Sequence, residues 1–295
     1  MKKKTIFEGA ATALVTPMRD GKIDYTALGN LIDMQISAGI SALVIGGTTG
    51  EAATLSDSER YEMYTFAKAK IAKRTKLILG TGTNDTRVAI KHTRFAETLG
   101  CDGALLVTPY YNKGTEEGIT RHYLTIAEST SLPIILYNVP SRTGVNLDFS
   151  VLDRLAREEN IVAIKEASDS LDRLVRLCCY GEDLALYAGN DTQIYPTLSL
   201  GGLGVISVVS NIFPKETSEI CKKYFEGRLA DSLAMQKRLF PLIRSLFLET
   251  NPAPVKFALS EMGIIENELR LPLSRVKNST ENAVRLALSE VSGNG

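Results

Sequence analysis

Lys165 directly follows a run of apolar and β-branched residues. Residues 161–164 are Ile, Val, Ala and Ile, a pattern typical of a strand that is buried on both faces. Burial lowers the pKa of an amine, and a neutral amine attacks carbonyl carbon. The pattern therefore makes Lys165 a candidate Schiff-base lysine. The alternative is that Lys165 ends an ordinary strand and extends its ammonium group into solvent.

Tyr137 ends an apolar run one predicted strand earlier in the chain, and Arg142 follows it. Adjacent parallel strands lie about 4.8 Å apart, so we expect the phenol of Tyr137 to lie near the amine of Lys165. Such a phenol can relay the protons that imine and carbon–carbon bond chemistry requires. The guanidinium of Arg142 has the planar shape that matches a carboxylate. Each residue also has a simpler explanation when it is considered alone. The ring of Tyr137 could only fill space at the mouth of the barrel, and Arg142 could be an ordinary surface charge.

Two further segments place polar or aromatic groups after predicted strands. Residues 46–51 read Gly-Gly-Thr-Thr-Gly-Glu. The glycines allow backbone N–H groups to approach an anion, and the hydroxyls of Thr48 and Thr49 suit a carboxylate. A plain glycine-rich turn is the alternative. Tyr110 and Tyr111 are adjacent after another strand, so their side chains point apart and at most one can face a pocket.

Eight strand-like runs alternate with helical patterns, which predicts a parallel α/β fold. The predicted strands cover residues 11–18, 42–45, 76–80, 103–107, 133–137, 161–165, 184–188 and 204–208. The G-x-G-x-x-G turn that an open nucleotide-binding sheet normally carries does not follow the first of them. We therefore expect a (β/α)8 TIM barrel, in which the polar residues at the carboxyl ends of the strands form the site.

Beyond residue 213 the helical patterns continue without intervening strands. The predicted helices cover residues 215–225, 229–248, 254–262 and 279–292, and residues 249–254 interrupt them. We expect a barrel core with the catalytic site in residues 1–213, and a C-terminal helical extension in residues 214–295 that packs on it.

The composition narrows the classes of function. Lys plus Arg and Asp plus Glu both number 34, so no basic field for nucleic acid or a membrane surface is expected. The basic start of the chain lacks the apolar core of a signal peptide, and no apolar run has the length of a membrane span. The four cysteines and two histidines show no metal-ligand spacing. We expect a cytoplasmic protein with reduced thiols, without a metal or a cofactor.

Four motifs together resemble those of the dihydrodipicolinate synthase family, within the pyruvate-dependent class I aldolases. They are Gly-Thr-Thr-Gly-Glu at 47–51, Pro-Tyr-Tyr-Asn-Lys at 109–113, Tyr-Asn-Val-Pro-Ser-Arg-Thr-Gly at 137–144 and Ile-Lys-Glu-Ala at 164–167. The resemblance spans the whole barrel. It implies condensation of pyruvate with L-aspartate-4-semialdehyde, the entry step to diaminopimelate and lysine, in a homo-oligomer built of tight dimers and usually a tetramer.

The resemblance also implies roles for the catalytic residues. Lys165 would form the imine with pyruvate, and Tyr137 would donate and accept protons. Thr48 would link Tyr137 to Tyr111, which a neighbouring subunit would supply.

Four further residues would bind the substrates by the same resemblance. Thr49 and Ile206 would hold pyruvate, and Gly189 would lie near the Schiff base. Arg142 would bind the carboxylate of the second substrate.

Other readings stay open at this point. N-acetylneuraminate lyase and keto-sugar-acid aldolases share the lysine and the tyrosine, but the lyases carry serine in place of the first threonine and lack the arginine, so Thr48 and Arg142 favour the synthase. A non-catalytic sensor on the same scaffold would bind a ligand without forming an imine. A phosphate-binding barrel is disfavoured because residues 201–204, rich in glycine, precede the eighth strand.

Members of the family that lysine inhibits carry a serine, histidines and a glutamate at places where this chain differs. These places are Ala52, Asp57, Arg60 and Val88. Although Asn84 and Tyr110 remain, we do not expect feedback inhibition by lysine.

Overall fold

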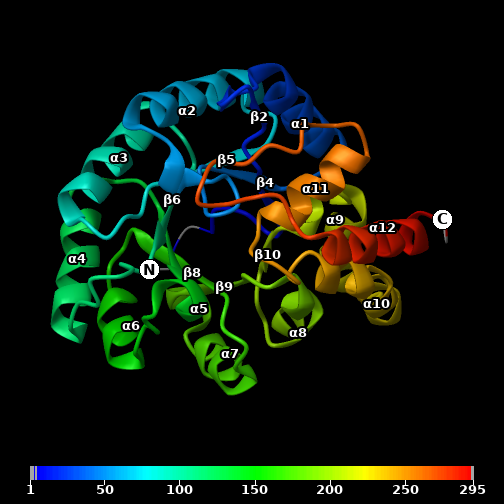
Figure 1. Ribbon diagram of the computed structural model, residues 1–295. Coiled ribbons are helices and arrows are strands. Elements are labelled where there is room, and N and C mark those ends of the chain that lie inside the picture. Colours follow the sequence, from blue (N-terminus) through cyan, green and yellow to red (C-terminus); the bar gives the residue numbers. More distant parts are fainter. Residues whose placement is uncertain (1–2, 4, 294–295) are drawn as a thin grey trace.

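Eight parallel strands close into a barrel in the computed structural model, which describes residue 3 and residues 5–293 (Figure 1). Around the barrel the strands follow the order β1-β10-β9-β8-β7-β6-β5-β4. Their bounds are β1 Gly9–Ala13, β4 Ala42–Ile45, β5 Lys76–Gly80, β6 Gly103–Val107, β7 Ile134–Asn138, β8 Ile161–Glu166, β9 Ala185–Ala188 and β10 Gly204–Ser207. The predicted (β/α)8 barrel is confirmed.

Helices surround the barrel and follow its strands in turn (Figure 1). The longer ones of the first part are α1 Tyr25–Ser37, α2 Asp57–Ile71, α3 Thr86–Thr98, α4 Glu116–Glu128, α6 Phe149–Leu155 and α7 Leu171–Cys178. Ser56 begins α2 as a capping box, because its side chain accepts from the N–H of Glu59 and the Glu59 carboxylate accepts from the N–H of Ser56. The shorter α5 Pro140–Thr143 and α8 Ile194–Ser199 follow β7 and β9.

The alternation of side chains along β8 explains where Lys165 points. Ile164 packs outward in a cluster with Val151 of α6 and Leu174 of α7. Successive residues of a strand face opposite sides, so Lys165 faces the inside of the barrel. Tyr137 lies two positions after Ile135 along β7, so both side chains face the same side and share the interior cluster.

The predicted first strand, residues 11–18, is wrong in its bounds. β1 is Gly9–Ala13, and Met18–Arg19 forms a separate strand β2 that pairs antiparallel with β3, Lys22–Ile23. Pro17 lies between β1 and β2, and it has no backbone N–H to donate to the hydrogen bonds between barrel strands. Gly21, with φ of +74°, closes the two-stranded turn.

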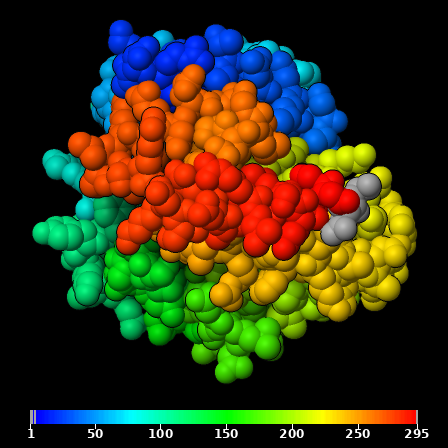
Figure 2. Space-filling view, turned by 45° about the vertical axis from the view of Figure 1, so that its right-hand side comes forward, coloured from blue at the N-terminus to red at the C-terminus, as the bar shows by residue number. Residues whose placement is uncertain are grey.

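In the described part of the chain, four α-helices follow β10, namely α9 Pro214–Phe225, α10 Leu229–Ser245, α11 Ala253–Glu261 and α12 Asn278–Gly293. α9 contacts β1 and α10, while α12 packs against α10 and α11. In Figure 2 the orange C-terminal segment lies against the blue N-terminal part of the chain, and the backbone N–H of Asp20 donates to Glu268 Oε2 at 2.9 Å. The boundary between a barrel core and an extension at residue 213 stays a prediction.

None of the described helices is long and apolar enough to cross a membrane.

Candidate active site

Lys165 and Tyr137 lie side by side at the carboxyl end of the barrel. Their Cα atoms are partners in the pairing of β8 with β7. The Nζ atom of Lys165 lies 4.3 Å from the centroid of the Tyr137 ring. Both side chains are buried, Lys165 at 5% exposure and Tyr137 at 7%. The structure therefore brings together the amine and the phenol that the sequence placed on adjacent strands.

Burial determines the protonation of this pair. Desolvation lowers the pKa of Lys165 from 10.5 to about 8, with Asp191 opposing the shift and Arg142 adding to it. Desolvation also raises the pKa of Tyr137, against the effects of Arg142 and of a hydrogen bond with Thr48. A useful fraction of Lys165 is consequently a neutral amine near neutral pH, beside a phenol that holds its proton. This is the state that a nucleophilic amine and a proton donor require.

The glycine-rich turn after β4 supplies Thr48 to this pair. Gly46 has φ of +70°, a conformation that suits glycine. A Cβ atom on Gly80 of β5 would lie 2.2 Å from the carbonyl oxygen of Gly46. Glycine at position 80 thus lets the turn fold tightly over the barrel mouth, which brings the hydroxyl of Thr48 within hydrogen-bonding reach of Tyr137.

Arg142 and Thr49 meet at Asn251, which lies in the segment between α10 and α11. The Nη2 atom of Arg142 donates to the carbonyl oxygen of Asn251 at 2.8 Å. The side-chain Nδ2 of Asn251 donates to Oγ1 of the buried Thr49 at 2.9 Å. The sequence suggested only a helix breaker for residues 249–254, and nothing in that pattern signalled a contact with the site.

A cleft of about 930 Å³ opens above Lys165, and Tyr137, Thr48, Thr49, Arg142 and Gly189 also line it. Ile243 and Arg244 of α10, with Phe247 and Leu248 just after that helix, form another part of its wall.

Gly189 is the first residue after β9, and a Cβ atom there would lie 2.6 Å from Cβ of Ala167 and 2.8 Å from the carbonyl oxygen of Glu166. Ile206 is fully buried in the apolar interior cluster that also contains Tyr137 and Tyr187. The side chain that lines the cleft from this part of the chain is that of Val208.

Tyr111 differs from the other predicted site residues. Its side chain is 88% exposed and its backbone has φ of +72°. Within the described part of this chain, it does not contribute to the lining of the cleft. Its neighbour Tyr110 lines a second, more apolar cavity of about 330 Å³ that shares Thr48 and Tyr137 with the cleft.

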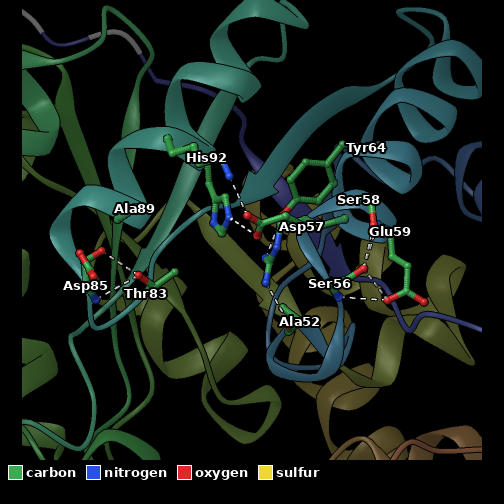
Figure 3. A network of polar contacts seen from close by, with 12 residues as sticks. Ala52, Ser56, Asp57, Ser58, Glu59, Tyr64, Thr83, Asp85, Ala89 and His92 are labelled. Carbon is green, nitrogen blue, oxygen red and sulfur yellow. Dashed lines mark hydrogen bonds and ion pairs between the residues drawn. The ribbon is translucent and has the colours of Figure 1, made fainter.

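Three of the four places considered for lysine sensitivity, Ala52, Asp57 and Arg60, lie at or just before the start of α2, and Figure 3 labels the first two. The fourth, Val88, lies in α3. Asp57 accepts from Lys91 Nζ at 2.8 Å and is hydrogen-bonded to His92 at 3.0 Å. Hydrogen bonds from Lys91 and then His92 lower the pKa of Asp57 to about 2. Arg60 donates to the carbonyl oxygen of Ala52 at 2.6 Å. Asp57 is thus engaged by two residues of α3, and Arg60 by the backbone of the turn before α2.

Comparisons with known proteins agree with this geometry. Residues 6–291 match the model of the Dihydrodipicolinate synthetase family. The 4-hydroxy-tetrahydrodipicolinate synthase of Clostridium novyi is 45% identical over 285 residues, 96% of each chain.

Among solved structures, the pyruvate complex of dihydrodipicolinate synthase from Acinetobacter baumannii is 42% identical, with a TM-score of 0.95 over 98% of this chain and 99% of that one. The enzyme from Cyanidioschyzon merolae with lysine bound is 37% identical, with a TM-score of 0.94 and the same coverage.

Proposed function

Because this chain belongs to the dihydrodipicolinate synthetase family, we propose that it is a 4-hydroxy-tetrahydrodipicolinate synthase. It condenses pyruvate with L-aspartate-4-semialdehyde, in the pathway to diaminopimelate and lysine. The observation that carries the proposal is the buried amine of Lys165 beside the ring of Tyr137, at the base of a cleft that opens to solvent. The relative solved with pyruvate supports the choice of the first substrate.

The neutral amine of Lys165 attacks the carbonyl carbon of pyruvate, so that a carbon–nitrogen bond forms and a carbinolamine results. Loss of water then gives a positively charged iminium. Removal of a proton from the methyl carbon makes an enamine, which forms the new carbon–carbon bond with the aldehyde. Tyr137 moves the protons in these steps, and its hydrogen bond with Thr48 keeps the phenol oriented.

The other site residues divide between the two substrates. Thr49, buried and oriented by Asn251, holds the carboxylate of pyruvate together with the chain around Ile206. Gly189 leaves room beside the Schiff base. Arg142 binds the carboxylate of the second substrate, for which its position in the wall of the cleft suits it.

Tyr111 completes the proton relay from a neighbouring subunit in this proposal. Its exposed side chain and the cavity beside Thr48 and Tyr137 are compatible with a tight dimer, and we further propose a dimer of such dimers in the cytoplasm. Lysine does not inhibit the enzyme, because Val88 offers no carboxylate and Asp57 is already paired.

Borohydride reduction in the presence of pyruvate tests the proposal. We expect one reduced pyruvyl adduct, located on Lys165 by peptide mass spectrometry, and no adduct in Lys165→Met. An Arg142→Ala variant should trap pyruvate like the parent but lose turnover with aspartate semialdehyde, since only the second substrate needs the guanidinium. Wild-type protein that stays unmodified at saturating pyruvate would reject the enzyme and favour a non-catalytic sensor. Faster turnover with sugar aldehydes than with aspartate semialdehyde would favour a keto-sugar-acid aldolase.

A further inference from the structure

Asp191 is a buried carboxylate in the wall of the catalytic cleft. It lies just after β9 and is 1% exposed. Its Oδ2 atom accepts from the backbone N–H groups of Val208 at 3.0 Å and Val209 at 2.8 Å. Its Oδ1 atom has no hydrogen-bond partner among the described residues. A hydrogen bond from Ser207 also favours the ionised carboxylate. The carboxylate is therefore held from the end of β10 and the turn after it, while Oδ1 lacks a partner, which ordinarily destabilises a buried polar group.

The position of Asp191 is fixed from a second element as well. Gln236 of α10 donates its Nε2 to the carbonyl oxygen of Asp191 at 3.0 Å. The chain thus holds this carboxylate between the turn after β9, the turn after β10 and a C-terminal helix. Such support is what a charged group needs if it is to keep a fixed distance from a reacting atom.

The other charged groups near Lys165 do not provide a buried, available anion. Glu166, the next residue of β8, is fully buried but is paired with Arg173 at 2.8 Å. Asp169 and Glu249 line the outer part of the cleft, where solvent reaches them. The cations that face the same cleft are Lys165 itself, Arg142 and Arg244.

The electrostatic effects agree with this reading. Asp191 raises the pKa of Lys165, against the larger effect of burial. Burial raises the pKa of Asp191, while hydrogen bonds from Ser207, Val209 and Val208 and the charge of Lys165 oppose that shift. Each group therefore favours the charged form of the other.

We propose that Asp191 is the counter-ion of the positive charge on the Lys165 nitrogen, first as ammonium and then as the iminium formed with pyruvate. The proposal deepens the proposed function and rests on it. The ammonium gives up one proton before the neutral amine forms the carbon–nitrogen bond, and the positive charge returns to the nitrogen when the carbinolamine takes a proton through Tyr137 and loses water. Asp191 neither gains nor loses a proton in these steps. A buried iminium beside Arg142 would otherwise lack a compensating charge. Asp191 is a positioning residue that acts through Lys165.

Removing the negative charge of Asp191 should change the pKa of Lys165 in a known direction. Without the carboxylate, the pKa of Lys165 falls further below about 8, so the neutral amine is present at lower pH. Capture of pyruvate should then begin at lower pH. At the same time the iminium loses its partner, so more pyruvate is needed to populate it. General damage to the site would weaken capture without moving its pH dependence downward.

Asp191→Asn tests the proposal, because an amide of the same shape can still accept from Val208 and Val209. The readout is the borohydride-trapped pyruvyl adduct on Lys165, measured against pH and pyruvate concentration. We expect the midpoint of the acidic limb to move down by about one pH unit, and half-maximal trapping to need roughly tenfold more pyruvate. Asp172→Asn removes a charge at an exposed position of α7 outside the lining of the cleft, and should leave both values as in the parent.

An unchanged or higher midpoint in Asp191→Asn would overturn the proposal. Absence of trapping in the wild-type protein would instead reject the proposed function. Infrared difference spectra of wild-type protein with and without pyruvate give a check that does not depend on the variant folding. With isotope-labelled aspartate, the spectra should show only ionised carboxylate when the imine forms. A new band of a protonated carboxyl group would also overturn the proposal. The absence of that band from folded Asp191→Asn protein would assign it to Asp191.

Discussion

Gly189 joins β9 to the cleft at a point where a larger residue does not fit. The added Cβ atom would lie 2.6 Å from Cβ of Ala167 and 2.8 Å from a backbone oxygen. Either β8 or β9 must then move, and β8 carries Lys165. At the scale of single residues, the position of Lys165 thus depends on the lack of a Cβ atom at position 189.

Gly189→Ala should accordingly reduce stability and pyruvate capture together. We expect a loss of about 1–3 kcal/mol in the free energy of unfolding, measured by urea denaturation, and slower formation of the borohydride-trapped adduct. Gly118→Ala is the matched control, since its Cβ atom in α4 would meet only Oγ1 of Thr115 at 3.4 Å. The control should be neutral or more stable by up to about 1 kcal/mol. Equal effects of the two substitutions would contradict the assigned role of Gly189.

The turn that carries Thr48 and Thr49 is held by a buried ion pair from the C-terminal helices. Nζ of Lys256 in α11 lies 2.6 Å from Oε1 of Glu51, and both side chains are 0% exposed. Lys256 also donates to the carbonyl oxygen of Thr16 at 3.0 Å. Glu51 has φ of +54°, an unfavourable conformation for a residue with a side chain. At the scale of elements, α11 therefore anchors the turn after β4.

Lys256→Met should leave the carboxylate of Glu51 buried without its cation. We expect a loss of about 3–5 kcal/mol in the free energy of unfolding, and partial recovery in the double variant Glu51→Gln with Lys256→Met. Arg228→Ala breaks a pair with Asp231 on the solvent-exposed surface and should leave the free energy of unfolding nearly unchanged. Denaturant melts of the four proteins measure these differences. If the double variant were less stable than Lys256→Met, the pair would not be the source of the effect.

At the scale of the whole molecule, the position of Tyr111 bears on how two copies of the chain would assemble. Its side chain is 88% exposed, whereas the pair that it would serve is buried. A group that acts on the same chain would be expected to lie in the lining of the cleft, and Tyr111 does not. The proposed reason is that its site is on a second copy of the chain.

Mixed oligomers test this arrangement. Lys165→Met and Tyr111→Phe should each have low activity alone. After subunit exchange, the Tyr111→Phe chain keeps Lys165 and receives Tyr111 from its partner, so one kind of site is complete. We expect activity in the mixture well above the average of the two variants, measured in an assay coupled to the downstream reductase. Activity equal to that average would place Tyr111 outside the relay or within its own subunit.

The sequence by itself determined the barrel and the central pair of the site. Strand and helix patterns depend on residues that are neighbours in the chain, so eight alternations were readable. Tyr137 and Lys165 are the last but one residues of consecutive strands, and consecutive strands of a barrel are paired. Their proximity followed from local patterns and the regular spacing of a parallel sheet. The family motifs added the roles that these patterns alone left open.

Only the tertiary structure decided which distant groups complete the site. Asn251 reaches Thr49 across 202 positions of sequence, and Lys256 reaches Glu51 across 205. Asp191 comes three residues after a predicted strand, and nothing in its neighbours in the chain distinguishes a buried carboxylate from an exposed one. Contacts of this kind arise when the barrel closes and the C-terminal helices fold back over its mouth. Burial and charge pairing depend on that closure, which the periodicity of any one segment does not encode.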